Sequence, residues 1–137
     1  MERFLQDECN PDQLSPLTLA FLGDAVFEMF ARERIVCKGS RPVSELHRLS
    51  VRDVCCAAQA TACKFILPGL TEEEAAVFRR GKNAHPGHVP KNADQSVYHE
   101  ATALEALFGY LYLCGRIDRL RELFEKIKDS QNMQKCD

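Results

Sequence analysis

Asp24 and Glu105 are lone carboxylates in two otherwise apolar segments, residues 14–27 and 101–113. Each segment predicts a helix that is apolar on every face, and such a helix is normally buried. A buried charge is costly unless something compensates it. One divalent cation held by oxygen ligands would compensate both acids at once. The pair therefore predicts a metal site built by two helices that are far apart in the chain.

In a second interpretation, each acid is neutralised by a partner within the protein. Asp24 would then accept hydrogen bonds from a helix end or pair with Arg32 or Arg34, since buried charges are usually paired. Glu105 has the same alternative. A glycine lies near each acid, Gly23 and Gly109, and glycine lets a second helix or a ligand approach the backbone closely. Two such sites in one chain favour the metal.

A basic segment lies between the two apolar segments, and residues 75–93 contain no acidic residue. Cations in a loop rich in Gly and Pro can meet phosphates with side chains and free backbone N–H groups. A solvated helix end would explain the first three cations, but not those in the loop. Few aromatic residues, which stack on unpaired bases, lie among the cations of this segment. The pattern therefore suits a duplex backbone better than splayed bases. The predicted phosphate-binding residues are Arg79, Arg80, Lys82, Asn83, His85, His88, Lys91 and Asn92.

Composition limits the class of protein. The formal net charge is −2, so any nucleic-acid contact must come from a local patch. No apolar run reaches the length that a membrane span needs, and the acidic N-terminus lacks the apolar core of a signal peptide. The 7 cysteines show no zinc-site spacing. We therefore expect a cytoplasmic protein with reduced thiols and no membrane association.

Helical segments separated by short breaks predict an all-α helical bundle. A Ser-Pro pair opens the first helix at residues 15–16, which should run to about residue 36. A second helix is expected over residues 42–65, and a capping box at residues 71–74 opens a third. A long helix from 94 or 96 to 114 and an amphipathic one from 118 complete the set. We expect a lead-in over 1–13, one domain over 14–128 and a flexible tail over 129–137.

These motifs resemble a known family. Residues 19–27, LAFLGDAVF, are similar to the signature helix of the ribonuclease III catalytic domain. Residues 101–113, ATALEALFGYLYL, are similar to its later catalytic helix. The RRGKNA and PKN sequences within residues 79–92 resemble the Mini-III subfamily, which is the catalytic domain alone. The resemblance covers about residues 14–127.

The resemblance implies an all-helical homodimeric endoribonuclease that cuts double-stranded RNA with Mg²⁺, with Mn²⁺ as a substitute. Asp24 and Glu105 match the family's metal-binding carboxylates, and the basic segment would hold the RNA. The subfamily is associated with maturation of 23S ribosomal RNA precursors, and a ribosomal protein partner is a further hypothesis. Leu17, Ala20 and Thr102 stand where full-length ribonuclease III has acids. A catalytically silent RNA-binding module is therefore the alternative, and a helical scaffold without RNA affinity is a third.

Overall fold

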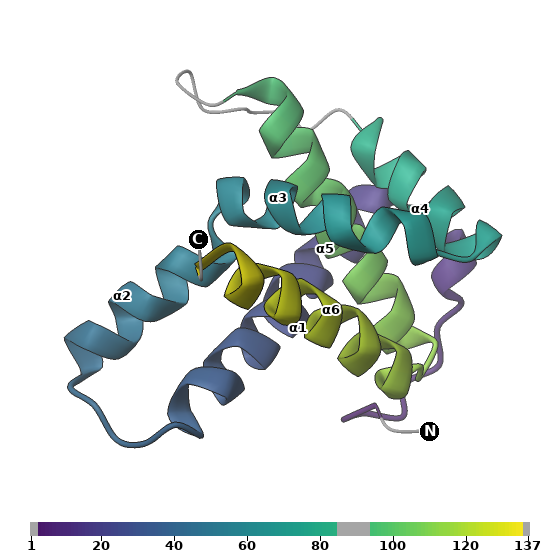
Figure 1. Cartoon of the computed structure of the whole chain (residues 1–137). Coiled ribbons are helices and arrows are strands. Elements are labelled where there is room, and N and C mark those ends of the chain that lie inside the picture. The colour runs from purple at the N-terminus through teal and green to yellow at the C-terminus, as the bar shows by residue number, and fades with distance from the viewer. Residues whose placement is uncertain (1–2, 85–93, 136–137) are drawn as a thin grey trace.

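The protein is a bundle of six α-helices in a computed structural model that describes residues 3–84 and 94–135 (Figure 1). No strand is found in this part of the chain, so the all-α prediction is confirmed. In chain order the helices are α1 (Pro16–Val36), α2 (Val43–Val54), α3 (Cys56–Ile66), α4 (Glu72–Lys82), α5 (Gln95–Leu113) and α6 (Ile117–Lys135). Short 3-10 turns precede α1 at Pro11–Gln13 and follow α3 at Leu67–Gly69.

Side-chain caps fix where three of the helices begin. The Ser15 hydroxyl accepts a hydrogen bond from the Thr18 N–H, as expected for the start of α1. Thr71 and Glu74 form the predicted capping box of α4, in which each side chain accepts from the other residue's N–H. Asp94 caps α5 by accepting from the Ser96 N–H. The caps satisfy N–H groups that have no partner within their own helix.

The expected helix over residues 42–65 is wrong, because the chain forms two helices there. Cys55 has an extended backbone (φ −68°, ψ 158°), which ends α2 and begins α3. The break lets α2 pack against α1, whereas the buried side chains of α3 face α5. One straight helix could not bury both apolar surfaces, so packing outweighs helix propensity here.

Helix α5 forms the centre of the core. Ten of its residues are buried, and α1, α3, α4 and α6 all pack against it. Rings from three helices meet edge to face: Phe27 lies 5.2 Å from Phe108 and 5.7 Å from Phe124, measured between centroids. The Glu105 segment is therefore buried on most sides, as its apolar pattern predicted.

Both ends of the chain are tied to the bundle where the structure describes them. In the lead-in, the Phe4 N–H donates to the Tyr112 hydroxyl at 2.8 Å. Helix α6 continues to Lys135, past the domain boundary expected at residue 128. Lys128 is itself buried and pairs with Asp53 of α2 at 3.0 Å. This pair ties α6 to α2 at the expected boundary.

Candidate active site

Two glycines bring the backbones of α1 and α5 into direct contact. A Cβ added at Gly23 would lie 1.6 Å from the Glu105 carbonyl oxygen, and one added at Gly109 would lie 2.1 Å from the Leu19 carbonyl oxygen. No side chain fits at either position, because such distances are far below van der Waals contact. Asp24 directly follows one of these glycines, so the contact fixes the two acid-bearing segments against each other.

The two acids line one cavity of about 200 Å³ between α1, α3 and α5. Its walls are made by Leu17, Ala20, Phe21, Asp24, Cys56, Tyr98, Ala101, Thr102 and Glu105. The predicted convergence of Asp24 and Glu105 on one pocket is therefore present in the fold. The expectation that α1 is buried on every face is wrong, however. Asp24 is exposed, and the Phe21 side chain is 85% exposed, because this face of α1 forms the pocket rim and the surface beside it.

The arginines considered as internal partners of Asp24 are engaged elsewhere. Arg32 pairs with Glu28 at 2.5 Å, and Arg34 pairs with Glu125 of α6. Within residues 3–84 and 94–135, neither Asp24 nor Glu105 forms an ion pair. The interpretation of two internally neutralised acids therefore has no support in the described structure.

The electrostatics of the pocket disfavour two ionised carboxylates without a counterion. Burial raises the pKa of Glu105 to about 8, and the nearby charge of Asp24 adds to this effect. Partial burial also raises the pKa of Asp24, with a further contribution from Glu28. A cation between the acids would replace repulsion with attraction and favour the charged form of both.

The donor set fits a hard cation such as Mg²⁺. No third His, Cys, Asp or Glu joins the two acids in a ligand cluster within the described residues. Mg²⁺ commonly uses one or two carboxylates, keeps several waters and takes the rest from substrate phosphate. The pocket volume leaves space for such water ligands. Asp24 and Glu105 are the residues that would hold the ion.

Stability should fall as pH rises when no divalent cation is present. Between its ordinary value of 4.5 and about 8, folded Glu105 keeps a proton that the unfolded chain releases. The raised pKa thus stabilises the fold at low pH, and this contribution is lost as pH rises through about 8. Each pKa unit corresponds to about 1.4 kcal/mol, so the expected loss is of the order of a few kcal/mol.

Urea unfolding at several pH values, with and without Mg²⁺, measures this loss. Glu105→Gln should remove most of the pH dependence, and Mg²⁺ should restore the stability of the wild type but not of this variant. Equal pH slopes for the wild type and Glu105→Gln would contradict the assignment.

Three lining residues with polar side chains, Cys56, Tyr98 and Thr102, were not proposed as site residues from the sequence. Thr102 donates its hydroxyl to the Tyr98 carbonyl oxygen at 3.0 Å, which ties two wall residues together along α5. Both lie on the Glu105 face at helical spacing, and this signal could have found them. Cys56 reaches the pocket only because the chain breaks at Cys55. No glycine or proline marks that break in the sequence.

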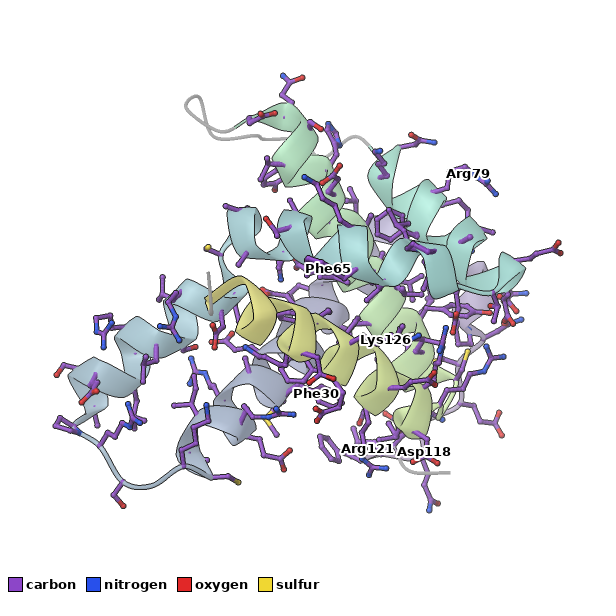
Figure 2. The ribbon with its side chains drawn as sticks, viewed as in Figure 1. Phe30, Phe65, Arg79, Asp118, Arg121 and Lys126 are labelled. Carbon is purple, nitrogen blue, oxygen red and sulfur yellow. The ribbon has the colours of Figure 1, made fainter. Side chains whose placement is uncertain are left out.

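The first half of the predicted phosphate-binding segment lies at the end of α4. Arg79, Arg80, Lys82 and Asn83 are exposed, and Arg79 points away from the bundle in Figure 2. Between them Gly81 packs against Ala103 and Ala106, on a different side of α5 from Glu105. None of the four lines the pocket of the two acids. His85, His88, Lys91 and Asn92 lie outside the described residues, so the role of this segment stays a prediction.

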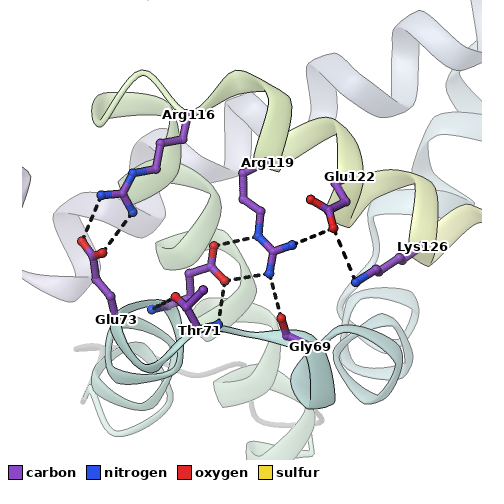
Figure 3. A network of polar contacts seen from close by, with 8 residues as sticks. Gly69, Thr71, Glu73, Arg116, Arg119, Glu122 and Lys126 are labelled. Carbon is purple, nitrogen blue, oxygen red and sulfur yellow. Dashed lines mark hydrogen bonds and ion pairs between the residues drawn. The ribbon is translucent and has the colours of Figure 1, made fainter.

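A polar network holds α4 in place against α6 (Figure 3). The Glu74 carboxylate accepts two hydrogen bonds from Arg119, at 2.8 Å each, besides closing the capping box with Thr71. These contacts lower the pKa of Glu74 and hold it ionised although it is 2% exposed. Arg119 also donates to the Gly69 carbonyl oxygen and pairs with Glu122. The network fixes the start of the helix that carries the basic segment.

No helix in the described ranges is long and apolar enough to cross a membrane. The family model described as the ribonuclease III domain matches residues 17–116. Mini-ribonuclease 3 of Symbiobacterium thermophilum is 48% identical over 120 residues, which cover 88% of this chain and 92% of that protein. Mini-ribonuclease 3 of a Thermoanaerobacter species is 45% identical over 112 residues, 82% of this chain and 79% of that one.

A crystal structure of a protein from Fusobacterium nucleatum superposes with a TM-score of 0.78 at 30% identity, covering 85% of this chain and 96% of that chain. The family model and the named relatives indicate the same family, and the solved structure has the same fold. The chain therefore belongs to the ribonuclease III family, as a double-strand-specific endoribonuclease of the Mini-ribonuclease III type.

Proposed function

We propose that the protein hydrolyses duplex RNA with Mg²⁺ held by Asp24 and Glu105, and that Mn²⁺ can substitute. The observation that supports this is the convergence of two acids on one cavity. Both have raised pKa values, and neither forms an ion pair with a residue that the structure describes. A cation held there would supply an activated water and charge stabilisation for the leaving oxygen of the scissile phosphate. Asp24 and Glu105 would hold that ion, and the wall residues Tyr98 and Thr102 shape the space beside it.

The test is a cleavage assay with a perfect RNA duplex and the matching single strand. We expect Mg²⁺-dependent cleavage of the duplex, none of the single strand, and loss of activity with a chelator. The silent-module alternative has an observation in its favour, because Leu17, Ala20 and Thr102 line the pocket where acids would add ligands. Retention of the duplex without any cleavage would establish that alternative, and no retention even at low salt would contradict both.

The cellular substrate we propose is the precursor of 23S ribosomal RNA, processed in the cytoplasm. The relatives named Mini-ribonuclease 3 support this subfamily assignment. Mapping RNA ends in cells with and without the protein should show unprocessed 23S termini in its absence. A ribosomal protein that presents the precursor is part of the same proposal, and it predicts faster cleavage of the protein-bound precursor than of naked RNA.

We also propose that the protein works as a homodimer, with the exposed apolar face of α1 at the interface. Phe21 is 85% exposed and Met29 is 58% exposed, although both are large apolar side chains. Apolar patches of this kind mark protein contacts. A dimer would place two pockets against one duplex and explain cleavage of both strands.

Phe21→Asp should convert the dimer into a monomer, because it places a charge in an apolar contact. Sedimentation equilibrium measures the change in mass directly. Val43→Asp is the matched control, since Val43 is 79% exposed on α2, away from this face. A Phe21→Asp protein that stays dimeric, or a monomeric wild type, would contradict the proposed interface.

A further inference from the structure

A second cavity, of about 150 Å³, lies where the end of α1, α2 and the second half of α6 meet. Its lining carries five cationic residues and, among the described lining residues, one carboxylate, Asp53. The cations are Arg34, Lys38, Arg41, Arg52 and Lys128. We call this cavity the basic pocket. It is separate from the predicted phosphate-binding segment at the end of α4, and the sequence did not suggest it.

Two of these cations are fixed by packing. Lys128 is 9% exposed, and its Nζ atom lies 5.4 Å from the centroid of the Phe124 ring. The Arg34 guanidinium lies 5.7 Å from the same centroid. Contacts of cations with an aromatic face are attractive and restrict the side chains further. The inner wall of the basic pocket therefore keeps its positive charges in place without a ligand.

Carboxylates near the basic pocket are fewer than its cations among the residues that the structure describes. Asp53 pairs with Lys128 at 3.0 Å and with Arg52 at 3.6 Å, and Arg34 pairs with Glu125. Arg41 pairs with Glu45 at 3.2 Å. Among the described residues, these pairs supply three carboxylates for the five cations, so positive charge is in excess in this part of the structure.

The rim of the basic pocket supplies the cations that are available to a ligand. Lys38 forms no ion pair with any residue that the structure describes. The pair between Arg41 and Glu45 is exposed, and exposed pairs are weak enough to exchange partners. Lys38 and Arg41 are therefore free to turn toward an anion seated between them and the fixed inner cations.

We propose that the basic pocket binds a phosphate group. Guanidinium and ammonium groups converge there from three helices, and guanidinium groups match phosphate oxygens with paired N–H donors. The cavity is smaller than pockets that enclose drug-sized ligands, but a phosphate or diphosphate is compact. Such a group has two sources of the same chemistry, the RNA backbone or a free diphosphate.

The position of the basic pocket makes the RNA source testable. Arg34 follows Asp24 by ten residues on α1, which is about 15 Å along the helix axis. At roughly 3 Å per base pair, this distance corresponds to about five base pairs. An RNA contact should thus appear only with duplexes that extend well beyond the cut. The prediction for RNA rests on the proposed function, whereas the prediction for a free diphosphate does not.

The experiment compares two double variants with the same change in charge. Lys38→Gln with Arg41→Gln alters the rim of the basic pocket. Arg48→Gln with Lys64→Gln is the control, because both side chains are exposed and neither lines the pocket. All four side chains are exposed, so folding should be unaffected.

Calorimetry with inorganic pyrophosphate measures the affinity of the protein for a free diphosphate. Each charge-assisted contact that the rim variant loses should weaken binding about tenfold, with no change in the control. RNA affinity is measured without divalent cations, on a duplex ending within about three base pairs of the cut and on one extending about ten beyond it. For the longer duplex, the slope of log affinity against log salt should fall by about one per lost contact.

A loss confined to pyrophosphate identifies a free phosphate ligand, and a loss confined to the longer duplex identifies the RNA backbone. Either result supports the basic pocket. Rim and control variants that behave alike in both assays would overturn it. A wild type that binds no duplex would instead refute the proposed function, and the pyrophosphate measurement would still decide the pocket.

Discussion

Asp24→Asn and Glu105→Gln should each lower the rate of RNA cleavage by about a thousandfold or more at ordinary Mg²⁺ concentrations. A bound metal ion contributes several kcal/mol of transition-state stabilisation, and about 4 kcal/mol corresponds to a factor of a thousand. Among the described residues, Asp24 and Glu105 are the only acids that line the pocket. No third acid can therefore replace the one that is removed. Single-turnover cleavage at saturating RNA isolates the chemical step.

Glu28→Gln is the matched control for this prediction. Glu28 lies one helical turn from Asp24 and raises its pKa, but it pairs with Arg32 and does not line the pocket. Its variant should cleave at a rate near that of the wild type. Duplex affinity without divalent cations should change little in either acid variant. Wild-type cleavage by a folded Asp24→Asn or Glu105→Gln protein would show that the metal assignment is wrong.

Gly23→Ala should destabilise the fold by about 3 kcal/mol or more, because the α1 and α5 backbones would have to separate. Overpacking a core usually costs about 1–3 kcal/mol even where side chains can move. Here the obstacle is the Glu105 carbonyl oxygen, 1.6 Å from the added Cβ, and a backbone atom cannot turn aside. Urea unfolding measures the change in free energy.

Gly69→Ala is the control for the glycine prediction. Its added Cβ would meet only the flexible end of Lys126, at 3.1 Å. We expect a change in stability well below that of Gly23→Ala, and Gly109→Ala should behave like Gly23→Ala because it faces the Leu19 carbonyl oxygen at 2.1 Å. Gly23→Ala with unchanged stability would mean that the two helices do not touch in this way.

The pair of acids that lines the pocket could be predicted because its signal in the sequence is local. One carboxylate in an apolar helix is visible in a short stretch of sequence, and a glycine next to Asp24 indicates close approach. The exposure of Asp24 was not predictable in the same way. It depends on which face of α1 the other helices leave open, and Phe21 and Met29 on that face look like core residues in the sequence.

Features that depend on how distant helices pack against each other could not be predicted from the sequence. Cys56 enters the pocket through a break at Cys55 that no glycine or proline marks. The ion pair of Arg34 with Glu125 joins residues 91 positions apart, so Arg34 looked equally suitable as a partner of Asp24. The basic pocket likewise combines residues from three helices. Hydrophobic periodicity identifies the apolar face of each helix, but it does not say which helices pack together.

The glycine contact between α1 and α5 sets the spacing of Asp24 and Glu105 independently of the side chains around them. Main-chain atoms set the spacing of the two acids, so wall positions such as Leu17 and Thr102 can change in evolution without moving either acid. The number of oxygen ligands around the pocket can therefore change while the backbone frame of the two acids stays the same. In protein engineering, the same frame would accept an added acid at Ala20 as a local change of coordination.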